Sequence, residues 1–361
     1  MIVRDRKPEL KRQAEPLYRA LLKDQGPLYI LGTNETGRDL ARALSSAGRE
    51  PEAFINDYEA IEQFCGRGVI KTAEVPRNAM VISCSTAVAP VTAWRRLKAA
   101  GIERVLDYFT LFLLGDGRFP APKFCGENIV DVELNQSRYR WLQTILADET
   151  SKRTLERLID FRYNFDVSVM GDFEVRLEAQ YFEPFIPLGK DEVFVDGGGF
   201  DGKTTEKFIE KCPNYRRVDY IEPDPLLLLA SRQRLARFER IHYHQLALGD
   251  RDAEANFCQT GTGSGAIQPA GNIRVRTRRL DDLLPKPPTF VKLDIEGAEV
   301  SALAGSRRII SRDHPRLAVC VYHRQSDFWR VPETVLSLYG EYKVLLRHYT
   351  EGVEETVMYF L

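Results

Sequence analysis

An apolar run that ends in an acid and three glycines, VFVDGGGFDG at residues 193–202, constrains this chain more than any other segment. A short run of Val and Phe is typical of a buried parallel strand. Glycines directly after such a strand let the backbone approach a ligand where the following helix begins. The segment therefore predicts a strand, a turn and a helix arranged around a ligand of nucleotide size.

The acid that ends this run, Asp196, bears on the identity of the ligand. In a dinucleotide-binding turn the pyrophosphate lies on the helix N-terminus, where a carboxylate would repel it. S-adenosylmethionine has no phosphate and carries a cationic ammonium, for which a carboxylate is a partner. Asp196 therefore favours a methyl donor over NAD, although Gly197, Gly199 and Gly202 satisfy the G-x-G-x-x-G spacing, which alone is a weak signal.

Composition excludes several classes of protein. The chain has 361 residues, about twice the usual domain length, and its 51 basic and 52 acidic side chains nearly balance, so we expect no nucleic-acid partner. Six scattered cysteines without a C-x-x-C pair indicate free thiols in a reducing compartment. The N-terminus has no apolar signal core, and no window approaches a membrane span. We expect a cytoplasmic protein with no membrane partner.

The pattern of the chain predicts an N-terminal Rossmann-like α/β domain at 1–120, a helical linker at 121–170 and a larger α/β domain at 171–361. In the first domain we expect strands at 28–31, 52–57, 80–84 and 104–107 and helices at 38–47 and 91–100. Its turn from Gly32 to Gly37 resembles a nucleotide-binding turn, with Asn56 and Asp57 where a ribose-binding acid would lie. The spacing departs from G-x-G-x-x-G, so a structural or partner-docking unit remains the alternative.

The second domain alternates strands with helices and ends in a hairpin. We expect strands at 193–196, 218–222, 241–245, 290–294 and 317–322, with helices at 203–211, 225–237, 299–310 and 332–338. A mixed segment at 255–282 carries short strands, and the closing hairpin runs from 342–347 into 356–361. This order predicts an α/β fold with a Rossmann-like methyltransferase sheet and a terminal antiparallel hairpin.

Glu222 ends the second strand of this domain, about 24 residues after Gly198. A carboxylate there can accept hydrogen bonds from both ribose hydroxyls. The alternative is a helix N-cap, a role that Asp224 could fill because it precedes Pro225. The strand end at 245–250 would lie against an adenine.

The segment 290–299, FVKLDIEGAE, carries two acids two residues apart. If the strand persists, Asp294 and Glu296 point the same way at the open end of the sheet. Two carboxylates there are costly unless they meet a cation, a metal or a polar ligand, so we expect a functional site. Glu299 begins the next helix and is predicted to complement the helix dipole.

Taken together, these segments resemble the FkbM family of S-adenosylmethionine-dependent methyltransferases over roughly residues 178–361. The matching features are Tyr181-Phe182, 194–202, 221–223, 247–249, the Gly-Ser segment 261–265, 279–283, 292–299 and 355–359. The resemblance implies an O-methyltransferase that acts on a hydroxyl of a sugar, a glycan or a polyketide-like compound. The N-terminal 110 residues lie outside it and look like the nucleotide-binding-type domain sometimes fused to such enzymes.

The resemblance also implies which residues contact S-adenosylmethionine. These are Tyr181, Asp196, Gly197, Gly198, Gly199, Asp201, Thr204, Glu222, Pro223, Ala247, Leu248, Gly249 and Asp294. It implies a role for Asp294 and Glu296 near the centre of methyl transfer.

A hydroxyl acceptor needs a group that takes its proton, and a general base with a pKa near 7 suits that task. His323, at the end of the fifth strand, is the preferred base, and His348, at the end of the sixth, is the second choice. We expect His242, His244 and His314 to be structural or surface groups. Alternatively, Asp294 and Glu296 bind a divalent ion that polarises the hydroxyl, although no metal motif indicates one.

Two other functions remain open from the sequence. The first is an NAD-dependent oxidoreductase or sugar-nucleotide-modifying enzyme built on both α/β domains. The second is a non-catalytic ligand-binding protein that keeps the fold. The expected partner is a small-molecule or glycan acceptor, and a homo-oligomer is possible.

Overall fold

The computed structural model describes residues 3–23, 26–260 and 265–361. The chain divides into two compact units. Unit 1 comprises Met1–Ser137, Arg153–Leu177 and His348–Glu354; unit 2 comprises Arg138–Lys152, Glu178–Arg347 and Glu355–Leu361. The linker expected at 121–170 is thus shared between the two units, and the loop of the closing hairpin belongs to unit 1.

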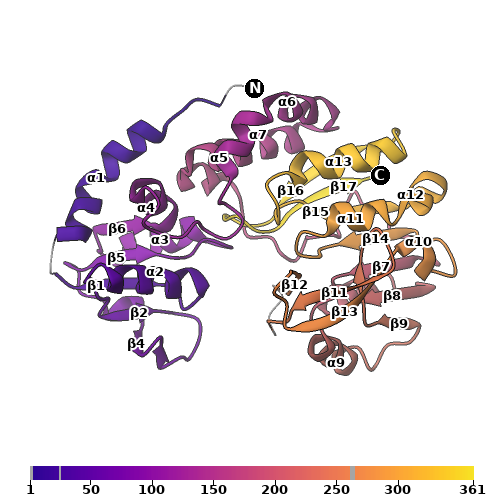
Figure 1. Ribbon diagram of the computed structural model, residues 1–361, viewed down its shortest axis with the longest axis horizontal. Coiled ribbons are helices and arrows are strands. Elements are labelled where there is room, and N and C mark those ends of the chain that lie inside the picture. Colours follow the sequence, from indigo (N-terminus) through magenta and orange to yellow (C-terminus); the bar gives the residue numbers. More distant parts are fainter. Residues whose placement is uncertain (1–2, 24–25, 261–264) are drawn as a thin grey trace. The chain divides into compact units, whose positions relative to one another are not determined.

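Unit 1 is built on a six-stranded sheet with the order β3-β4-β2-β1-β5-β6 (Figure 1). Its strands are β1 (Leu28–Leu31), β2 (Ala53–Ile55), β3 (Gln63–Phe64), β4 (Arg67–Ile70), β5 (Met80–Ser83) and β6 (Arg104–Asp107). β1 pairs in parallel with both β2 and β5, as expected of a doubly wound half-domain. The β3–β4 hairpin was not predicted, because its strands are short and half exposed.

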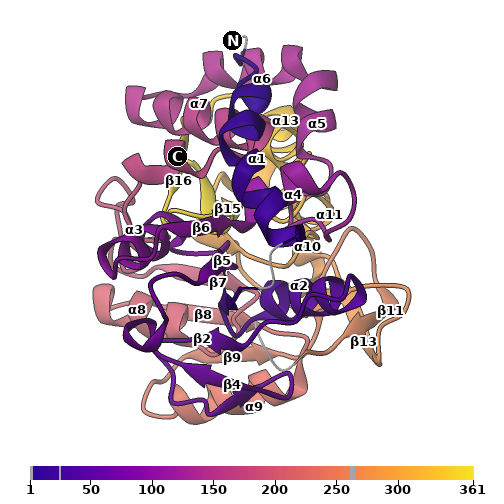
Figure 2. The same ribbon diagram turned by 90° about the vertical axis from the view of Figure 1, so that its left-hand side faces the viewer.

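Helices cover the sheet of unit 1 on both faces. They are α1 (Lys7–Lys23), α2 (Glu35–Ser46), η1 (Thr72–Glu74), α3 (Pro90–Ala99) and α4 (Tyr108–Gly115). Alternate residues of β5 face opposite cores: Met80 and Ile82 pack with α2, whereas Val81 packs with α3. The sequence did not predict α1, which lies along α4 in Figure 2 and buries Tyr18 and Leu21 in the core that α2 shares.

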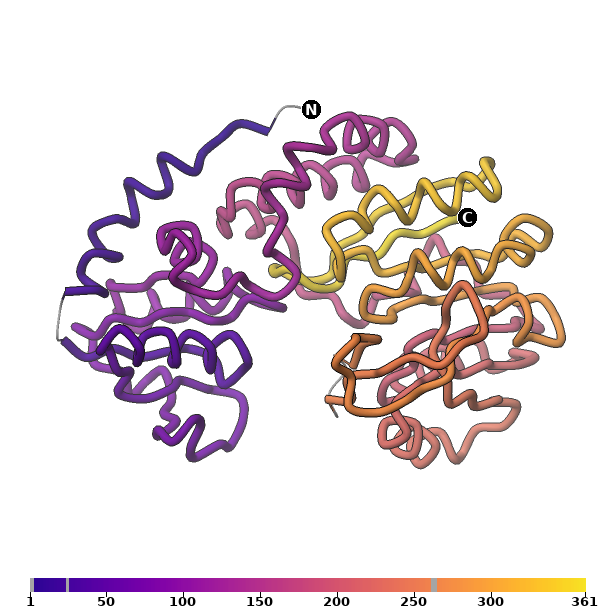
Figure 3. The backbone as a smooth tube through the Cα atoms, in the orientation of Figure 1, coloured from indigo at the N-terminus to yellow at the C-terminus, as the bar shows by residue number. Residues whose placement is uncertain are grey.

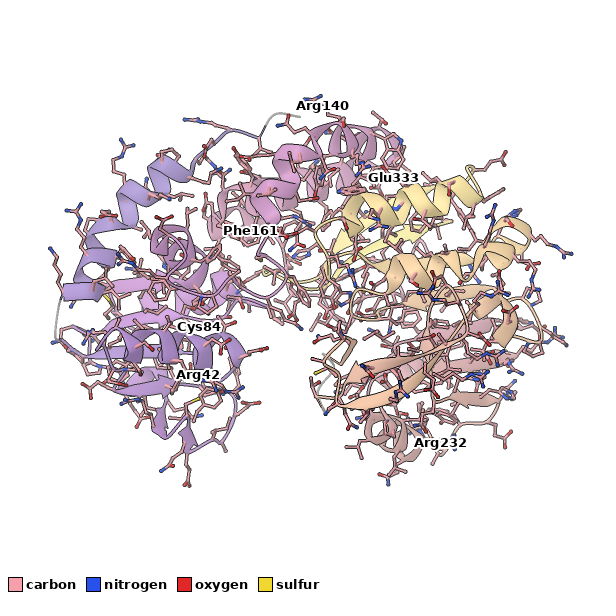
Figure 4. The ribbon with its side chains drawn as sticks, viewed as in Figure 1. Arg42, Cys84, Arg140, Phe161, Arg232 and Glu333 are labelled. Atoms are coloured by element: carbon pink, nitrogen blue, oxygen red, sulfur yellow. The ribbon has the colours of Figure 1, made fainter. Side chains whose placement is uncertain are left out.

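Helices follow in the segment predicted to be helical at 133–165. They are α5 (Asn128–Leu134), α6 (Gln136–Ile145), α7 (Glu149–Asn164) and the short η2 (Val167–Asp172). In unit 1, Phe161 of α7, labelled in Figure 4, packs edge to face on Phe109 of α4 with ring centroids 4.9 Å apart. The later part of α7 is therefore part of the core of unit 1 rather than a linker.

Unit 2 contains a seven-stranded sheet with the order β16-β17-β15-β14-β7-β8-β9. Its strands are β7 (Val193–Gly197), β8 (Arg217–Ile221), β9 (Ile241–His244), β14 (Phe290–Leu293), β15 (Arg316–Cys320), β16 (Val344–His348) and β17 (Thr356–Phe360). β7, β8, β9, β14 and β15 run parallel, and β17 is antiparallel to β15. The expected α/β fold with a closing antiparallel hairpin is confirmed, and Figure 3 traces that hairpin in yellow.

The helices of unit 2 are α8 (Lys203–Lys211), α9 (Pro225–Arg234), α10 (Leu280–Leu283), α11 (Glu299–Ala304), α12 (Arg307–Asp313) and α13 (Asp327–Leu338). The single helix expected at 299–310 is wrong: Gly305 and Ser306 separate α11 from α12. α13 begins five residues earlier than expected and contains Pro332 in its interior.

A second, four-stranded sheet of unit 2 has the order β10-β13-β11-β12. Its strands are β10 (Ala247–Leu248), β11 (Ala253–Cys258), β12 (Ala266–Ile267) and β13 (Ile273–Arg278). They account for the short strands expected at 255–282, while residues 261–264 of the Gly-Ser segment lie outside the described residues. None of the helices in the described ranges could cross a membrane on length and hydropathy.

Candidate active site

The turn between β7 and α8 requires glycine at two positions. Gly198 has φ +75°, and a Cβ built on it would lie 1.9 Å from the carbonyl oxygen of Asp294. A Cβ on Gly199 would lie 2.2 Å from the ring of Tyr220. The turn therefore packs its backbone directly against β8 and the end of β14.

An acid lies at the start of α8. The carboxylate of Asp201 accepts a hydrogen bond from the N–H of Lys203 at 3.1 Å, and Gly202 at the N-cap has no side chain that could do so. Thr204 follows in the first turn of α8. Because a dinucleotide would place its pyrophosphate at such a helix N-terminus, the carboxylate there disfavours that ligand.

A buried ion pair supports the turn from beneath. Nζ of Lys292 on β14 lies 3.1 Å from Oδ1 of Asp196, and their side chains are 2% and 0% exposed. Asp196 also accepts from Thr205, while Lys292 donates to the carbonyl oxygens of Gly197 and Gly198 at 3.2 and 2.7 Å. The oxygens of Asp196 face Lys292 and Thr205, so this geometry departs from the direct ammonium contact expected from the sequence.

Charge explains how Lys292 stays ionised there. Burial lowers the pKa of a lysine, but the nearby carboxylates of Asp196 and Asp294 outweigh that effect and raise it to about 12. The pair ties the end of β7 to β14 at the point where the glycine turn begins. Asp196 thus holds the shape of the turn through Lys292.

Glu222 joins the turn to the end of β8. Its carboxylate accepts from the N–H groups of Phe200 and Asp224, each at 2.9 Å, and the residue is 6% exposed. Burial raises its pKa to about 7, although these two backbone hydrogen bonds act in the opposite direction. Each oxygen keeps a further lone pair, so the carboxylate can still accept from ribose hydroxyls.

Asp224 is the N-cap residue of α9. The sequence had left helix capping open as an alternative role for Glu222. It accepts from the N–H groups of Leu226 and Leu227 at 2.8 and 3.4 Å. Gln259, which follows β11, donates to the same oxygen at 2.7 Å. Capping therefore falls to Asp224, and Glu222 retains the position next to the glycine turn, with Pro223 between the two acids.

The stretch from Ala247 to Gly249 is held by the smaller sheet of unit 2. Ala247 and Leu248 form β10 and are buried, and the N–H of Gly249 donates to Arg278 O at 3.0 Å. A Cβ on Gly197 would lie 3.2 Å from a methyl carbon of Leu248. This stretch thus lies beside the start of the glycine turn.

Four side chains converge beyond the ends of β14 and β15. Nδ1 of His323 lies 2.8 Å from Oε1 of Glu299, and its Nε2 lies 3.4 Å from both Oδ1 of Asp294 and Oε1 of Glu296. The side chains of Asp294 and Glu296 are 24% and 16% exposed, whereas those of His323 and Glu299 are 1% and 0% exposed. The cluster thus has a buried side and a side that faces solvent.

The expectation that Asp294 and Glu296 share one side of a continuing strand is wrong. β14 ends at Leu293, and Glu296 and Gly297 have φ angles of +52° and +92°. A left-handed residue other than glycine costs about 1 kcal/mol, so the surrounding structure holds Glu296 in this turn. The two acids converge on His323 because the backbone turns.

Tyr181 lies on the other side of Asp294. Its hydroxyl donates to Oδ2 of Asp294 at 2.7 Å, its N–H donates to the hydroxyl of Tyr359, and its φ is +66°. Gln180 donates to the hydroxyl of Tyr181 at 3.0 Å and also to Glu355. Tyr181 therefore fixes the orientation of Asp294. The sequence had placed Tyr181 among the cofactor contacts.

The charges within the cluster favour the ionised forms of His323 and Asp294. Burial acts against a charged imidazole, but Glu299, Glu296 and Asp294 together raise the pKa of His323 well above its ordinary value. Burial also opposes ionisation of Asp294, yet Lys292 and His323 bring its pKa below the ordinary value. His323 therefore differs from the base with a pKa near 7 that the sequence led us to expect.

His348, the second candidate for the base, belongs to unit 1. Its ring packs edge to face on Phe173 with centroids 4.7 Å apart, and Thr350 lies 3.3 Å from its Nε2. Burial lowers its pKa to about 3. Asp294, Glu296 and His323, in contrast, all belong to unit 2.

Sequence reasoning missed several residues of this site. Lys292 lies within the buried run of β14, and Tyr322, whose hydroxyl donates to Oδ1 of Asp294 at 3.4 Å, follows the buried run of β15. Apolar neighbours in the sequence hide the polar atoms of both residues. Glu299 was interpreted as a helix-dipole residue, whereas it contacts His323. Asp327 lies close enough to Glu299 that burial, reinforced by this negative charge, raises its pKa to about 7. A useful signal was the density of acids after residue 293.

The candidate nucleotide turn of unit 1 is closed by its own side chains. Asn34 accepts from the N–H of Gly37 at 2.8 Å and donates to the carbonyl oxygen of Cys84, labelled in Figure 4, at 2.9 Å. Asn56 donates to Thr33 at 2.7 Å, and Asp57 pairs with Arg96 at 3.0 Å. The groups expected to meet a nucleotide thus have partners within the unit.

The N-terminus of α3 in unit 1 also has a partner from within the unit. Oε2 of Glu351 accepts from the N–H of Thr92 at 2.7 Å, and Oε1 accepts from its hydroxyl at 2.6 Å. A Cβ on the next residue, Gly352, would lie 2.1 Å from the carbonyl oxygen of Ala87. The hairpin loop supplies the anion that a helix N-terminus attracts.

Unit 2 has a Rossmann-like sheet of the methyltransferase type. Residues 196–351 match the family model described as the methyltransferase FkbM domain, and the chain contains a domain of this family. This match favours a methyltransferase over the oxidoreductase that the sequence left open.

Two relatives extend the comparison. The chain is similar over 98% of its length to the whole crystallised chain of methyltransferase FkbM from Methylobacillus flagellatus KT, with a TM-score of 0.73 and 25% identity. It is also 26% identical over 195 residues to 2-O-methyltransferase NoeI of Sinorhizobium fredii (strain NBRC 101917 / NGR234). The aligned region covers 46% of this chain and 79% of NoeI. The first likeness covers both units.

Proposed function

We propose that this protein is an S-adenosylmethionine-dependent O-methyltransferase. One observation carries the proposal: the glycine turn after β7 touches the residue that begins the acidic cluster, because a Cβ on Gly198 would lie 1.9 Å from Asp294 O. A cofactor held at that turn would therefore lie beside Asp294, Glu296 and His323. This juxtaposition is what a transfer from cofactor to acceptor needs.

The residues at the turn fit S-adenosylmethionine better than a dinucleotide. Glu222 offers its remaining lone pairs to ribose hydroxyls, and the glycine backbone permits close approach. Asp201 at the start of α8 disfavours a pyrophosphate and tolerates a cationic ligand. The proposed contacts are Tyr181, Asp294, Glu222, Pro223, the turn from Gly197 to Gly199, Asp201, Thr204, and Ala247 to Gly249.

S-adenosylmethionine supplies a methyl group on a cationic sulfur, so that a C–O bond to the acceptor forms as the C–S bond breaks and its electron pair returns to sulfur. The acceptor hydroxyl must also lose its proton. Asp294 and Glu296 have the exposed side chains of the cluster, whereas that of His323 is 1% exposed. We therefore assign contact with the hydroxyl and receipt of its proton to the carboxylates, with His323 as the positioning residue behind them.

The similarity to NoeI supports oxygen as the atom of the acceptor that receives the methyl group. NoeI is named a 2-O-methyltransferase, and its similarity with this chain covers 195 residues. The proposed acceptor class is a hydroxyl of a sugar, a glycan or a polyketide-like compound.

Methyl transfer is tested by incubating the full chain with S-adenosylmethionine labelled in its methyl group and a panel of oligosaccharides and polyketides. The expected result is S-adenosylhomocysteine together with an acceptor labelled on oxygen. We expect Glu296→Gln to lower kcat by about 10²–10⁴-fold, with the Kd for S-adenosylhomocysteine kept. Glu254→Gln, at an exposed carboxylate on β11 paired with Arg274, is the matched control.

Binding measured by calorimetry separates the rival functions. Tight binding of NAD without binding of S-adenosylhomocysteine would overturn the proposal. Binding of S-adenosylhomocysteine without transfer to any member of the panel would favour the non-catalytic protein. Transfer to nitrogen or carbon would keep the methyltransferase and refute the choice of oxygen.

A further inference from the structure

The spacing in the acidic cluster is that of ligands around a metal ion. Nε2 of His323 lies 3.4 Å from Oδ1 of Asp294 and 3.4 Å from Oε1 of Glu296. A hydrogen bond between such charged groups is shorter, about 2.7–2.9 Å. Two ligand atoms that are each about 2.0–2.2 Å from one ion, at a tetrahedral or octahedral angle, lie roughly 3.0–3.5 Å apart.

The second nitrogen of the imidazole is held as it is in metal sites. Nδ1 of His323 lies 2.8 Å from Oε1 of Glu299, which also accepts from the N–H of Ile295 at 2.9 Å. A histidine ligand usually gives its other N–H to a carboxylate, which fixes the ring and directs the free nitrogen toward the ion. Glu299 therefore directs Nε2 toward Asp294 and Glu296.

One carboxylate oxygen on the buried side of the cluster accepts no hydrogen bond from the described residues. Glu299 is 0% exposed, and its Oε2 has no hydrogen-bond partner among the described residues. Ligand atoms of Asp294, Glu299 and His323 lie within 4.8 Å of one another. A buried carboxylate oxygen of this kind is stabilised by a cation or a donor nearby.

We propose that Asp294, Glu296 and Nε2 of His323 bind one divalent first-row metal ion, with Glu299 as the positioning residue behind His323. One imidazole and two carboxylates suit such an ion and leave further coordination positions open. The solvent-facing side of Asp294 and Glu296 is where an acceptor hydroxyl would enter. This role rests on the proposed function: the ion would bind the hydroxyl and weaken its O–H bond, and the proton would pass to a carboxylate oxygen of Asp294 or Glu296 that does not bind the ion.

Metal binding is measured first without any reaction. The full chain is treated with a chelator, dialysed and titrated with Mn²⁺, with calorimetry and electron paramagnetic resonance as readouts. We expect one site, weakened at least tenfold in Glu296→Gln and about 10–100-fold in Glu299→Gln. Glu254→Gln on β11, whose side chain is 67% exposed, should bind as the unaltered protein does.

The variants need a check of their fold, because Glu299 is buried. Circular dichroism and binding of S-adenosylhomocysteine report whether each variant folds, and Glu296→Gln, at a partly exposed side chain, serves if Glu299→Gln does not. Absence of Mn²⁺ binding at millimolar concentration, or equal binding by Glu296→Gln and Glu254→Gln, would overturn the metal site.

Activity then separates this inference from the proposed function. If the chelated protein transfers methyl groups at an unchanged rate, the metal inference fails and the methyltransferase stands. If Mn²⁺ binds as described and no acceptor is methylated, the metal site stands and the proposed function fails. Loss of activity on chelation that Mn²⁺ restores would support both.

Discussion

The two units present the same local motif, a strand followed by a glycine turn and a helix, and use it differently. In unit 1 the turn from Gly32 to Gly37 is closed by Asn34 and Asn56, and Glu351 occupies the neighbouring helix start. In unit 2 the turn after β7 is supported from behind by Lys292 and bordered by Glu222. The groups that face the turn, rather than the glycines, distinguish the proposed ligand site from a closed turn.

Charge makes the same distinction. The support of the turn in unit 2 is a buried cation paired with a buried anion, Lys292 with Asp196. The turn in unit 1 relies on neutral amides, and the ion pairs near it, such as Asp57 with Arg96, are partly exposed. Removing one charge should therefore have very different effects in the two units.

The largest expected effect is that of Lys292→Met, which leaves Asp196 buried without a counter-ion. We expect the free energy of unfolding to fall by about 3–5 kcal/mol and the affinity for S-adenosylhomocysteine to be lost. Arg67→Met in unit 1, whose pair with Glu50 is about one-third to one-half exposed, should cost at most about 1 kcal/mol. Urea denaturation compares the two variants, and equal losses would break the contrast.

Next in size is Gly198→Ala, compared with Gly66→Ala in the β3–β4 turn of unit 1. Both glycines have φ +75°, so both variants carry the left-handed penalty of about 1 kcal/mol. Only the Cβ at Gly198 meets backbone, at 1.9 Å, which should add about 1–3 kcal/mol and weaken cofactor binding. Thermal unfolding and calorimetry measure both effects, and similar losses in the two variants would argue against close packing of the turn.

Glu222 gives the site a pH dependence that the turn of unit 1 lacks. Its pKa in the folded protein is raised from 4.5 to about 7, so ionisation costs stability as pH rises between these values. Ribose hydroxyls favour the ionised form, so S-adenosylhomocysteine should bind about tenfold more weakly at pH 6 than at pH 8. Calorimetry across this range is the measurement, and Glu222→Gln should abolish the trend.

The smallest effect is expected for Glu351→Gln in unit 1. Loss of charge at the start of α3 should lower the free energy of unfolding by about 1 kcal/mol, because the amide keeps one acceptor for Thr92. The affinity for S-adenosylhomocysteine should stay the same. A large change in that affinity, measured by calorimetry, would show that the loop contributes to the cofactor site.

Most of the fold could be predicted because it depends on local patterns. The apolar runs of β1, β5 and β7 are short and uninterrupted, that of β14 contains one polar residue, Lys292, and all four are followed by glycine or polar residues, as buried parallel strands are. Failures occurred where tertiary contacts stabilise an element, as in α1, or where the pattern is too short, as in β3. The break between α11 and α12 also escaped, since Gly305 lies against the backbone of Gly249.

The sequence alone determined most of the strands and helices, the glycine turn after β7 and the acids at the ends of β7, β8 and β14, because strand and turn preferences act over a few residues. Only the tertiary structure decided their partners. Asp196 meets Lys292 from a separate strand, and Glu296 meets His323 because the chain turns at Glu296. Such pairs depend on the register of strands distant in sequence, and the electrostatics of a buried charge depends on its neighbours in space.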